Sequence, residues 1–201
     1  MIEKEQFEDI KDKLRVCREE RGLNKEDQKR NFRVDYTKEL AKFFEAERDN
    51  NQYGIIKALC DMIVVCVNAG GNIGCASCEF TNINLTYPII YRSIDIKGLL
   101  YELRREGYDP YKCLLETIKE LNSRTGSWSE EEGKWVKDKG AYTKEEAREV
   151  AKEILKKDYV EYPQSVLRAG QRYWQFVAEN HFEIKEWYKA DYASCKLESV
   201  E

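Results

Sequence analysis

The chain has 201 residues, of which 36% are charged and only three are proline, and its formal net charge is −4. This length can bury a substantial core, and a composition rich in Lys, Glu, Leu and Ala favours helices over a β-sandwich or a barrel. The negative net charge argues against a protein that coats an extended nucleic acid. With no apolar N-terminal segment and no run of about 18 apolar residues, we expect a cytoplasmic protein with no membrane partner.

Apolar residues spaced three to four apart predict a series of helices in the first half of the chain. Residues 3–21 and 26–48 have the pattern of amphipathic helices. Residues 53–69 are apolar on almost every side, which is typical of a helix enclosed by its neighbours. Asp61 is the single charge in this helix after Lys57, and a buried carboxylate needs a partner because its unpaired burial costs several kcal/mol or more.

The region that follows predicts a long loop and two more helices. Residues 70–88 are rich in Gly, Asn and Ser, and loops of this length are often functional. Helices are expected over 89–106 and 109–122, the second beginning with the helix-start pair Asp109–Pro110.

The last third of the chain predicts a hairpin or loop followed by two helices. Trp128 and Trp135 lie on either side of a turn that forms a loop or a short hairpin. Thr143 forms a capping box for a helix over 143–158, and the aromatic-rich segment 164–188 is expected to be a final helix. We therefore predict an all-α fold, with a helical core over 1–125 and a C-terminal extension over 126–201 that packs on this core.

Seven cysteines in a chain without a signal peptide indicate reduced thiols rather than a disulfide framework. Cys75 and Cys78 form the one pair with metal-like spacing, but no second such pair and only the distant His181 could complete a tetrahedral zinc site. The pair is therefore either half of a metal site or two ordinary thiols, and the role of Cys75 and Cys78 stays open.

Two carboxylates have the positions that a divalent metal site requires. Glu39 and Asp61 are expected on inward faces of consecutive helices, and carboxylates projected from facing helices hold Mg²⁺ or Mn²⁺ together with phosphate oxygens. The alternative is that Glu39 is a surface residue and that Asp61 pairs with a backbone or asparagine group.

The segments KELAKFFEA, residues 38–46, and IIKALCDMIVVCVNA, residues 55–69, resemble the MazG-like all-α nucleoside triphosphate pyrophosphohydrolases, especially the short versions found in phage genomes. The similarity covers roughly residues 20–125. It implies a MazG-like helical bundle, a nucleotide ligand, Mg²⁺ as cofactor and a homodimer or homotetramer, located in the host cytoplasm if the protein is phage-encoded. GYDPYKCLLETIKELNSR, residues 107–124, resembles the family's later helix, whose basic turn meets phosphate, and this implies roles for Asn122 and Arg124.

Only two of the family's four metal-ligand positions hold a carboxylate in this chain. The family carries Glu-x-x-Glu on one helix and Glu-x-x-Asp on the next; Glu39 and Asp61 match, whereas Lys42 and Ala58 stand where the family has glutamates. Glu39 and Asp61 are therefore the expected metal ligands. Lys42 and Lys57 could instead contact phosphate as point charges, and Asn68 shares the stripe of Asp61.

These residues are compatible with two functions and with a third role that uses no ligand. The first is a protein that binds the phosphates of a nucleotide with reduced or lost hydrolysis, for example a phage protein that sequesters a signalling nucleotide. The second is a working Mg²⁺-dependent enzyme that converts (d)NTP to (d)NMP and pyrophosphate. The third is a structural or inhibitory module with a relic pocket. Whether the chain is an enzyme stays open, and no catalytic residue is assigned.

Overall fold

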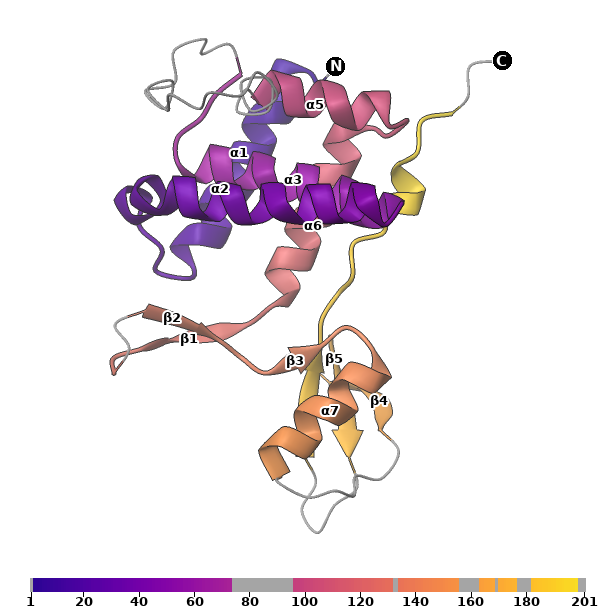
Figure 1. Ribbon diagram of the computed structural model, residues 1–201. Coiled ribbons are helices and arrows are strands. Elements are labelled where there is room, and N and C mark those ends of the chain that lie inside the picture. The colour runs from indigo at the N-terminus through magenta and orange to yellow at the C-terminus, as the bar shows by residue number, and fades with distance from the viewer. Residues whose placement is uncertain are drawn as a thin grey trace. The chain divides into compact units, whose positions relative to one another are not determined.

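The structure is a computed structural model that describes residues 2–73, 96–131, 134–155, 163–168, 170–176 and 182–198 (Figure 1). The chain divides into two compact units, which are described separately. One unit comprises Met1–Ile118 and Ala190–Glu201, and the other comprises Lys119–Lys189.

The first unit is helical. Its helices are α1 (Lys4–Glu19), α2 (Lys25–Arg48), α3 (Gln52–Asn68), α5 (Ile96–Arg105) and α6 (Pro110–Ser123), the last of which continues into the second unit. α3 contacts α1, α2 and α5, and nine of its residues are buried. The prediction of an enclosed central helix is therefore confirmed. Since its covering comes from this same chain, burial of α3 by itself requires no second subunit.

Helices α2 and α3 form an antiparallel hairpin with a connection of three residues. Asn51 begins α3, because its Oδ1 accepts a hydrogen bond of 3.0 Å from the backbone N–H of Gly54. Asn24 caps α2 in the same way, accepting 2.8 Å from the N–H of Asp27. These two caps set where the long helices start and therefore which residues face each other across the hairpin.

The end of the chain returns to the helical unit. A short 3₁₀ helix, η2 (Tyr192–Cys195), packs against the start of α6. The N–H of Asp109 donates to the carbonyl of Cys195 at 2.8 Å, and the hydroxyls of Thr117 and Tyr192 lie 2.9 Å apart. Residues 190–198 are thus part of the helical unit in structure, although residues 119–189 separate them from it in sequence.

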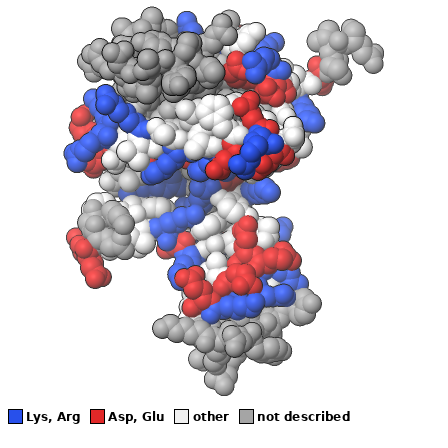
Figure 2. Space-filling view, viewed as in Figure 1, with Lys and Arg blue, Asp and Glu red and all other residues white. Residues whose placement is uncertain are grey.

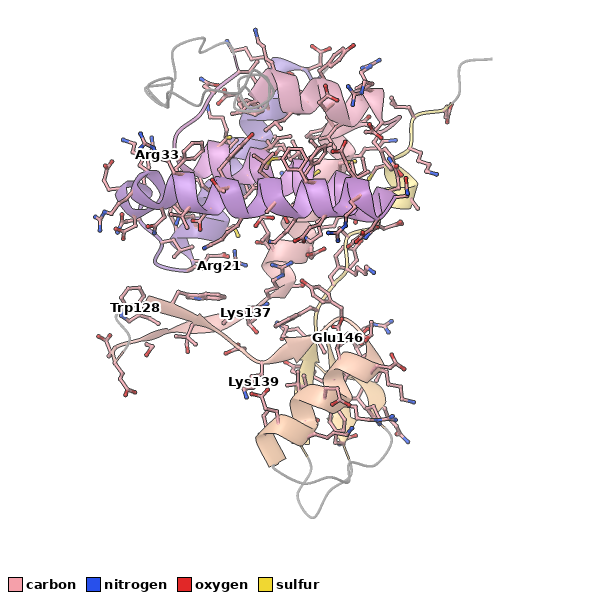
Figure 3. All side chains as sticks on the ribbon, viewed as in Figure 1. Arg21, Arg33, Trp128, Lys137, Lys139 and Glu146 are labelled. Atoms are coloured by element: carbon pink, nitrogen blue, oxygen red, sulfur yellow. The ribbon has the colours of Figure 1, made fainter. Side chains whose placement is uncertain are left out.

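The second unit contains two sheets and one helix. β1 (Gly126–Ser129) and β2 (Lys134–Lys137) form an antiparallel hairpin in which Trp128 lies opposite Trp135. Trp128 and Lys137 lie on the same side of this hairpin (Figure 3), as the alternation along each strand requires. The hairpin that the sequence left as one of two options is therefore present.

The larger sheet of this unit has the order β3-β6-β5-β4, formed by β3 (Gly140–Ala141), β4 (Gln164–Arg168), β5 (Gln171–Phe176) and β6 (Phe182–Glu186). β3 pairs parallel to β6, and the other pairs are antiparallel. Helix α7 (Lys144–Leu155) contacts this sheet, and their shared core consists of Ala141, Ala147, Ala151, Phe176 and Ile184.

The predicted all-α fold, with a helical extension, is wrong, because residues 164–186 form strands instead of a final helix. Gly170 has a φ of 77°, a conformation that lets β4 and β5 join in a tight turn. Trp174 and Phe176 are two residues apart and point to the α7 side, so the aromatic pattern follows the period of a strand. Among the described residues, none of the helices combines the length and apolar composition of a membrane span.

Candidate functional site

A hollow of about 260 Å³ lies along the α2–α3 hairpin, and it contains four of the residues singled out in the sequence. Glu39 and Lys42 line it from α2, and Lys57 and Asp61 line it from α3. We call it the α2–α3 hollow. Its remaining described lining residues are Glu45, Ala46, Asp49, Asn51, Gly54 and Ala58.

The hollow exists because small residues form its floor where the two helices approach. A Cβ added to Gly54 would lie 2.8 Å from the Cβ of Ala46, so the helices are nearly in backbone contact there. Residues equally far from this contact along antiparallel helices face each other. Counting four residues outward on each helix therefore sets Lys42 opposite Ala58, and counting seven sets Glu39 opposite Asp61.

Each of the two facing carboxylates is held by a lysine of its own helix. Lys42 Nζ lies 2.7 Å from Glu39, and Lys57 Nζ lies 3.4 Å from Asp61. The side chains of Glu39 and Asp61 are only 15% and 19% exposed, so these pairs are less screened by solvent than ordinary surface pairs. The half-buried carboxylate of Asp61 therefore has an ion-pair partner in Lys57, one helical turn away.

The charges of the lining remain unbalanced. Four carboxylates and two ammonium groups give the hollow a net charge of −2. Over the face that α2 presents, Lys and Arg atoms alternate with Asp and Glu atoms (Figure 2). A polyphosphate entering a lining of this charge would be repelled unless a cation accompanied it.

Mg²⁺ fits this site only together with a phosphate. In the described part of the chain, no three His, Cys, Asp or Glu side chains are grouped closely enough to hold a metal ion. Mg²⁺ is commonly held by one or two carboxylates plus substrate phosphates and water, however, and Glu39 with Asp61 supplies that number. The donor set is thus sufficient for a metal–phosphate complex but not for a metal cage built from protein side chains alone.

Glu45 and Asp49 extend the acidic lining toward the helix connection. Asp49 is ten residues beyond Glu39, about 15 Å along the helix axis, so the two carboxylates cannot share one ion. Ten residues is close to three whole turns, so the helical period alone predicts that Asp49 lies on the same face as Glu39. The small floor residues carry no comparable signal in the sequence.

Asn68 lies at the other end of α3 and outside the described lining of the α2–α3 hollow. Its Oδ1 is 3.5 Å from Nη1 of Arg18 on α1. It is seven residues, about 10 Å, beyond Asp61. The structure therefore does not bring Asn68 together with the facing carboxylates.

Asn122 and Arg124 belong to the second unit, where Arg124 is engaged in a buried network. Its guanidinium pairs with the carboxylate of Glu120, a residue only 1% exposed, and lies over the ring of Tyr142. Tyr142 Oη also donates to Glu120 at 3.1 Å, and burial raises the pKa of Tyr142. Asn122 lines a separate hollow of about 530 Å³ within residues 119–189.

The described cysteines are buried thiols. Cys17, Cys60, Cys66, Cys113 and Cys195 are free, and each is at most 5% exposed. The neighbouring Cys60 thiol, followed by burial, raises the pKa of Cys113, which keeps it in the unreactive protonated form. Cys75 and Cys78, together with the predicted loop 70–88 beyond residue 73, lie outside the described residues.

In comparisons with family models, curated proteins and solved structures, nothing matches the chain.

Proposed function

We propose that the α2–α3 hollow binds the phosphate groups of a nucleotide together with Mg²⁺, with hydrolysis reduced or lost. The observation that supports this most directly is that Glu39, Lys42, Lys57 and Asp61 line one hollow. From sequence alone, the resemblance to MazG-like pyrophosphohydrolases groups the helical positions of Glu39, Lys42, Ala58 and Asp61. The hairpin geometry agrees with that grouping.

The two lysines decide how the site would treat its ligand. The more exposed Lys42 carries a mobile ammonium group that can turn from Glu39 to phosphate oxygens, whereas the more enclosed Lys57 stays beside Asp61 and adds a fixed positive charge. The released carboxylate of Glu39 is then available to the metal that accompanies the phosphates. Asn51 keeps its Nδ2 as a donor at the far end of the hollow, because the cap uses only its Oδ1.

Reduced hydrolysis follows from the number of carboxylates. Bound Mg²⁺ would supply positive charge to the phosphates and a coordination place for water. With Ala58 and Lys42 opposite each other, the hollow lacks two carboxylates that would hold and deprotonate such a water. The lining of the hollow therefore has enough groups to hold an intact nucleotide but too few carboxylates to cleave one efficiently.

A ligand panel tests the proposal. The protein is incubated with nucleoside triphosphates and cyclic dinucleotides, with and without Mg²⁺, and the solution is chromatographed before and after heat denaturation. Intact nucleotide released only on denaturation supports binding without cleavage. A nucleoside monophosphate with pyrophosphate would instead support the second candidate, a Mg²⁺-dependent pyrophosphohydrolase, and absence of both across the panel would reject both candidates.

Two single variants test whether retention of the nucleotide depends on the α2–α3 hollow. Lys42→Gln and Lys57→Gln should each weaken retention, because each removes a cation that faces the phosphates. Lys38→Gln is the matched control, since Lys38 pairs with Asp35 at 3.2 Å on the exposed face of the same helix. Equal weakening by the control would show that overall charge, and not this hollow, governs binding.

A further inference from the structure

A second hollow in the helical unit has a basic lining. It has a volume of about 260 Å³ and lies between α1, the start of α2 and the turn that follows α3. Four of its lining residues are cationic and one is a carboxylate, which gives a net charge of +3; they are Lys11, Arg15, Arg18, Lys25 and Asp12. We call it the basic hollow. Its described lining residues and those of the α2–α3 hollow do not overlap.

The cations converge on one turn from two helices. Lys11, Arg15 and Arg18 follow one face of α1 at intervals of four and three residues. Arg18 reaches Asn68 at the end of α3, with 3.5 Å between Nη1 and Oδ1. The stem of Lys25 lies over Gly70, because a Cβ on Gly70 would be 3.1 Å from Lys25 Cε.

Two of these cations have no counter-charge among the described residues. Lys11 pairs with Glu8 at 2.8 Å, and Arg15 pairs with Glu19 at 3.0 Å. Within the part of the chain that the structure describes, no carboxylate pairs with Arg18 or Lys25. Like charges that line one hollow repel each other, and an anion that joins Arg18 and Lys25 there would relieve this repulsion.

The start of α2 adds to the positive potential. Lys25 is the first residue of a 24-residue helix, whose N-terminal N–H groups carry partial positive charge. The two carboxylates of this first turn are engaged elsewhere, because Glu26 pairs with Lys29 at 3.1 Å and Asp27 with Arg30 at 3.2 Å.

We propose that the basic hollow binds a phosphate group of a small molecule. A guanidinium and an ammonium group that share one opening match the oxygens of phosphate, and the helix start favours the same charge. The site needs no metal, in contrast to the acidic α2–α3 hollow. It stands independently of the proposed function, since its residues and its charge are different.

Isothermal titration with inorganic phosphate and with pyrophosphate, without Mg²⁺ and at constant ionic strength, tests this site. We expect saturable binding of one anion per chain to the wild-type protein. Arg18→Gln with Lys25→Gln should weaken it at least about tenfold, because two charge-assisted contacts are lost.

Two double variants complete the experiment. Lys38→Gln with Lys152→Gln removes the same charge from exposed pairs on α2 and α7 and should leave the affinity unchanged. Lys42→Gln with Lys57→Gln alters only the α2–α3 hollow and should also leave it unchanged. Absence of saturable binding, equal weakening by the exposed-pair variant, or loss confined to the Lys42 and Lys57 variant would each overturn the assignment.

Discussion

Placing glutamates at positions 42 and 58, where the resembled family has carboxylates, should raise the affinity of the α2–α3 hollow for Mg²⁺ above that of the wild-type protein. The double substitution Lys42→Glu and Ala58→Glu changes facing positions on the two helices. It moves the net charge of the lining from −2 to −5, since the first substitution changes it by two and the second by one. The hollow of about 260 Å³ beside Ala58 offers room for the new side chain.

The gain can be estimated from Coulomb's law. A divalent cation about 5 Å from a unit charge gains about 1.7 kcal/mol in water, and salt at physiological strength reduces this to about 0.9 kcal/mol. Three unit changes then give about 2.7 kcal/mol, or roughly a hundredfold increase in Mg²⁺ affinity. Without metal, the variant should be less stable than the wild type, because position 58 is only 2% exposed and both new carboxylates join a lining that already holds Glu39 and Asp61.

Thermal unfolding at increasing Mg²⁺ concentration measures this effect. The melting temperature of the variant should rise with Mg²⁺ much more steeply than that of the wild type, because ligand that binds only the folded state stabilises it. Lys38→Glu with Ala41→Glu introduces the same charge change on the exposed face of α2 and is the matched control. If Mg²⁺ raises the melting temperatures of both double variants equally, the facing geometry of Lys42 and Ala58 is wrong.

Three other substitutions test the packing around these sites. Gly54→Ala should lower the free energy of unfolding by about 1 kcal/mol in urea titrations, because overpacking of about 1–3 kcal/mol exceeds a helix-propensity gain of about 1 kcal/mol. Arg124→Met should lower it by about 3 kcal/mol, because buried Glu120 loses its ion partner. Tyr111→Phe removes a 2.9 Å hydrogen bond to Asp9. Hydrogen bonds from Lys13 and, to a smaller extent, Tyr111 lower the pKa of Asp9. Their contribution to stability is full above the ordinary carboxyl pKa and is lost as pH falls through the lowered pKa. The Tyr111→Phe variant should therefore lose less stability on acidification than the wild type, which unfolding curves across the acid range will measure.

Each of these three stability predictions has a result that would contradict it. Stability of the Gly54 variant at or above the wild-type value would exclude the close helix approach. Tyr142→Phe keeps the ion pair of Glu120, so a loss as large as that of Arg124→Met would show that the phenol and not the guanidinium stabilises the network. Identical acid limbs for Tyr111→Phe and the wild type would remove the role of Asp9.

The helical half of the fold was predictable because local signals and burial agree there. The apolar face of residues 3–21 and the all-round apolar segment 53–69 correspond to α1 and α3 within two residues at each end. Thr143 also acts as expected, because its Oγ1 accepts a hydrogen bond from the N–H of Glu146 at the start of α7. In each case a short stretch of sequence determines both the element and its boundary.

The sheet unit was not predictable by the same reasoning. The aromatic residues of 164–188 recur at intervals that fit a helix as well as a strand, and β5 is stabilised by pairing with strands on both sides. Gly170, between the segments QSVLR and QRYWQF, was the available hairpin signal. The site shows the same division, since Glu39 and Asp61 could be paired from helix spacing, whereas the commitment of Arg124 to Glu120 depends on tertiary contacts.

Under the proposed function, the choice between holding and cleaving a nucleotide depends on which cation the carboxylates of the α2–α3 hollow retain. Lys42 is 60% exposed, so separating it from Glu39 costs only about 0.5 kcal/mol and the freed carboxylate can turn to a metal. Lys57 is 28% exposed and shares its more enclosed environment with Asp61, so that pair separates less readily. Under the proposed function, the site would offer the carboxylate of Glu39 to Mg²⁺ and keep the ammonium group of Lys57 beside the phosphates, an arrangement that would strengthen phosphate binding but give an attacking water little help.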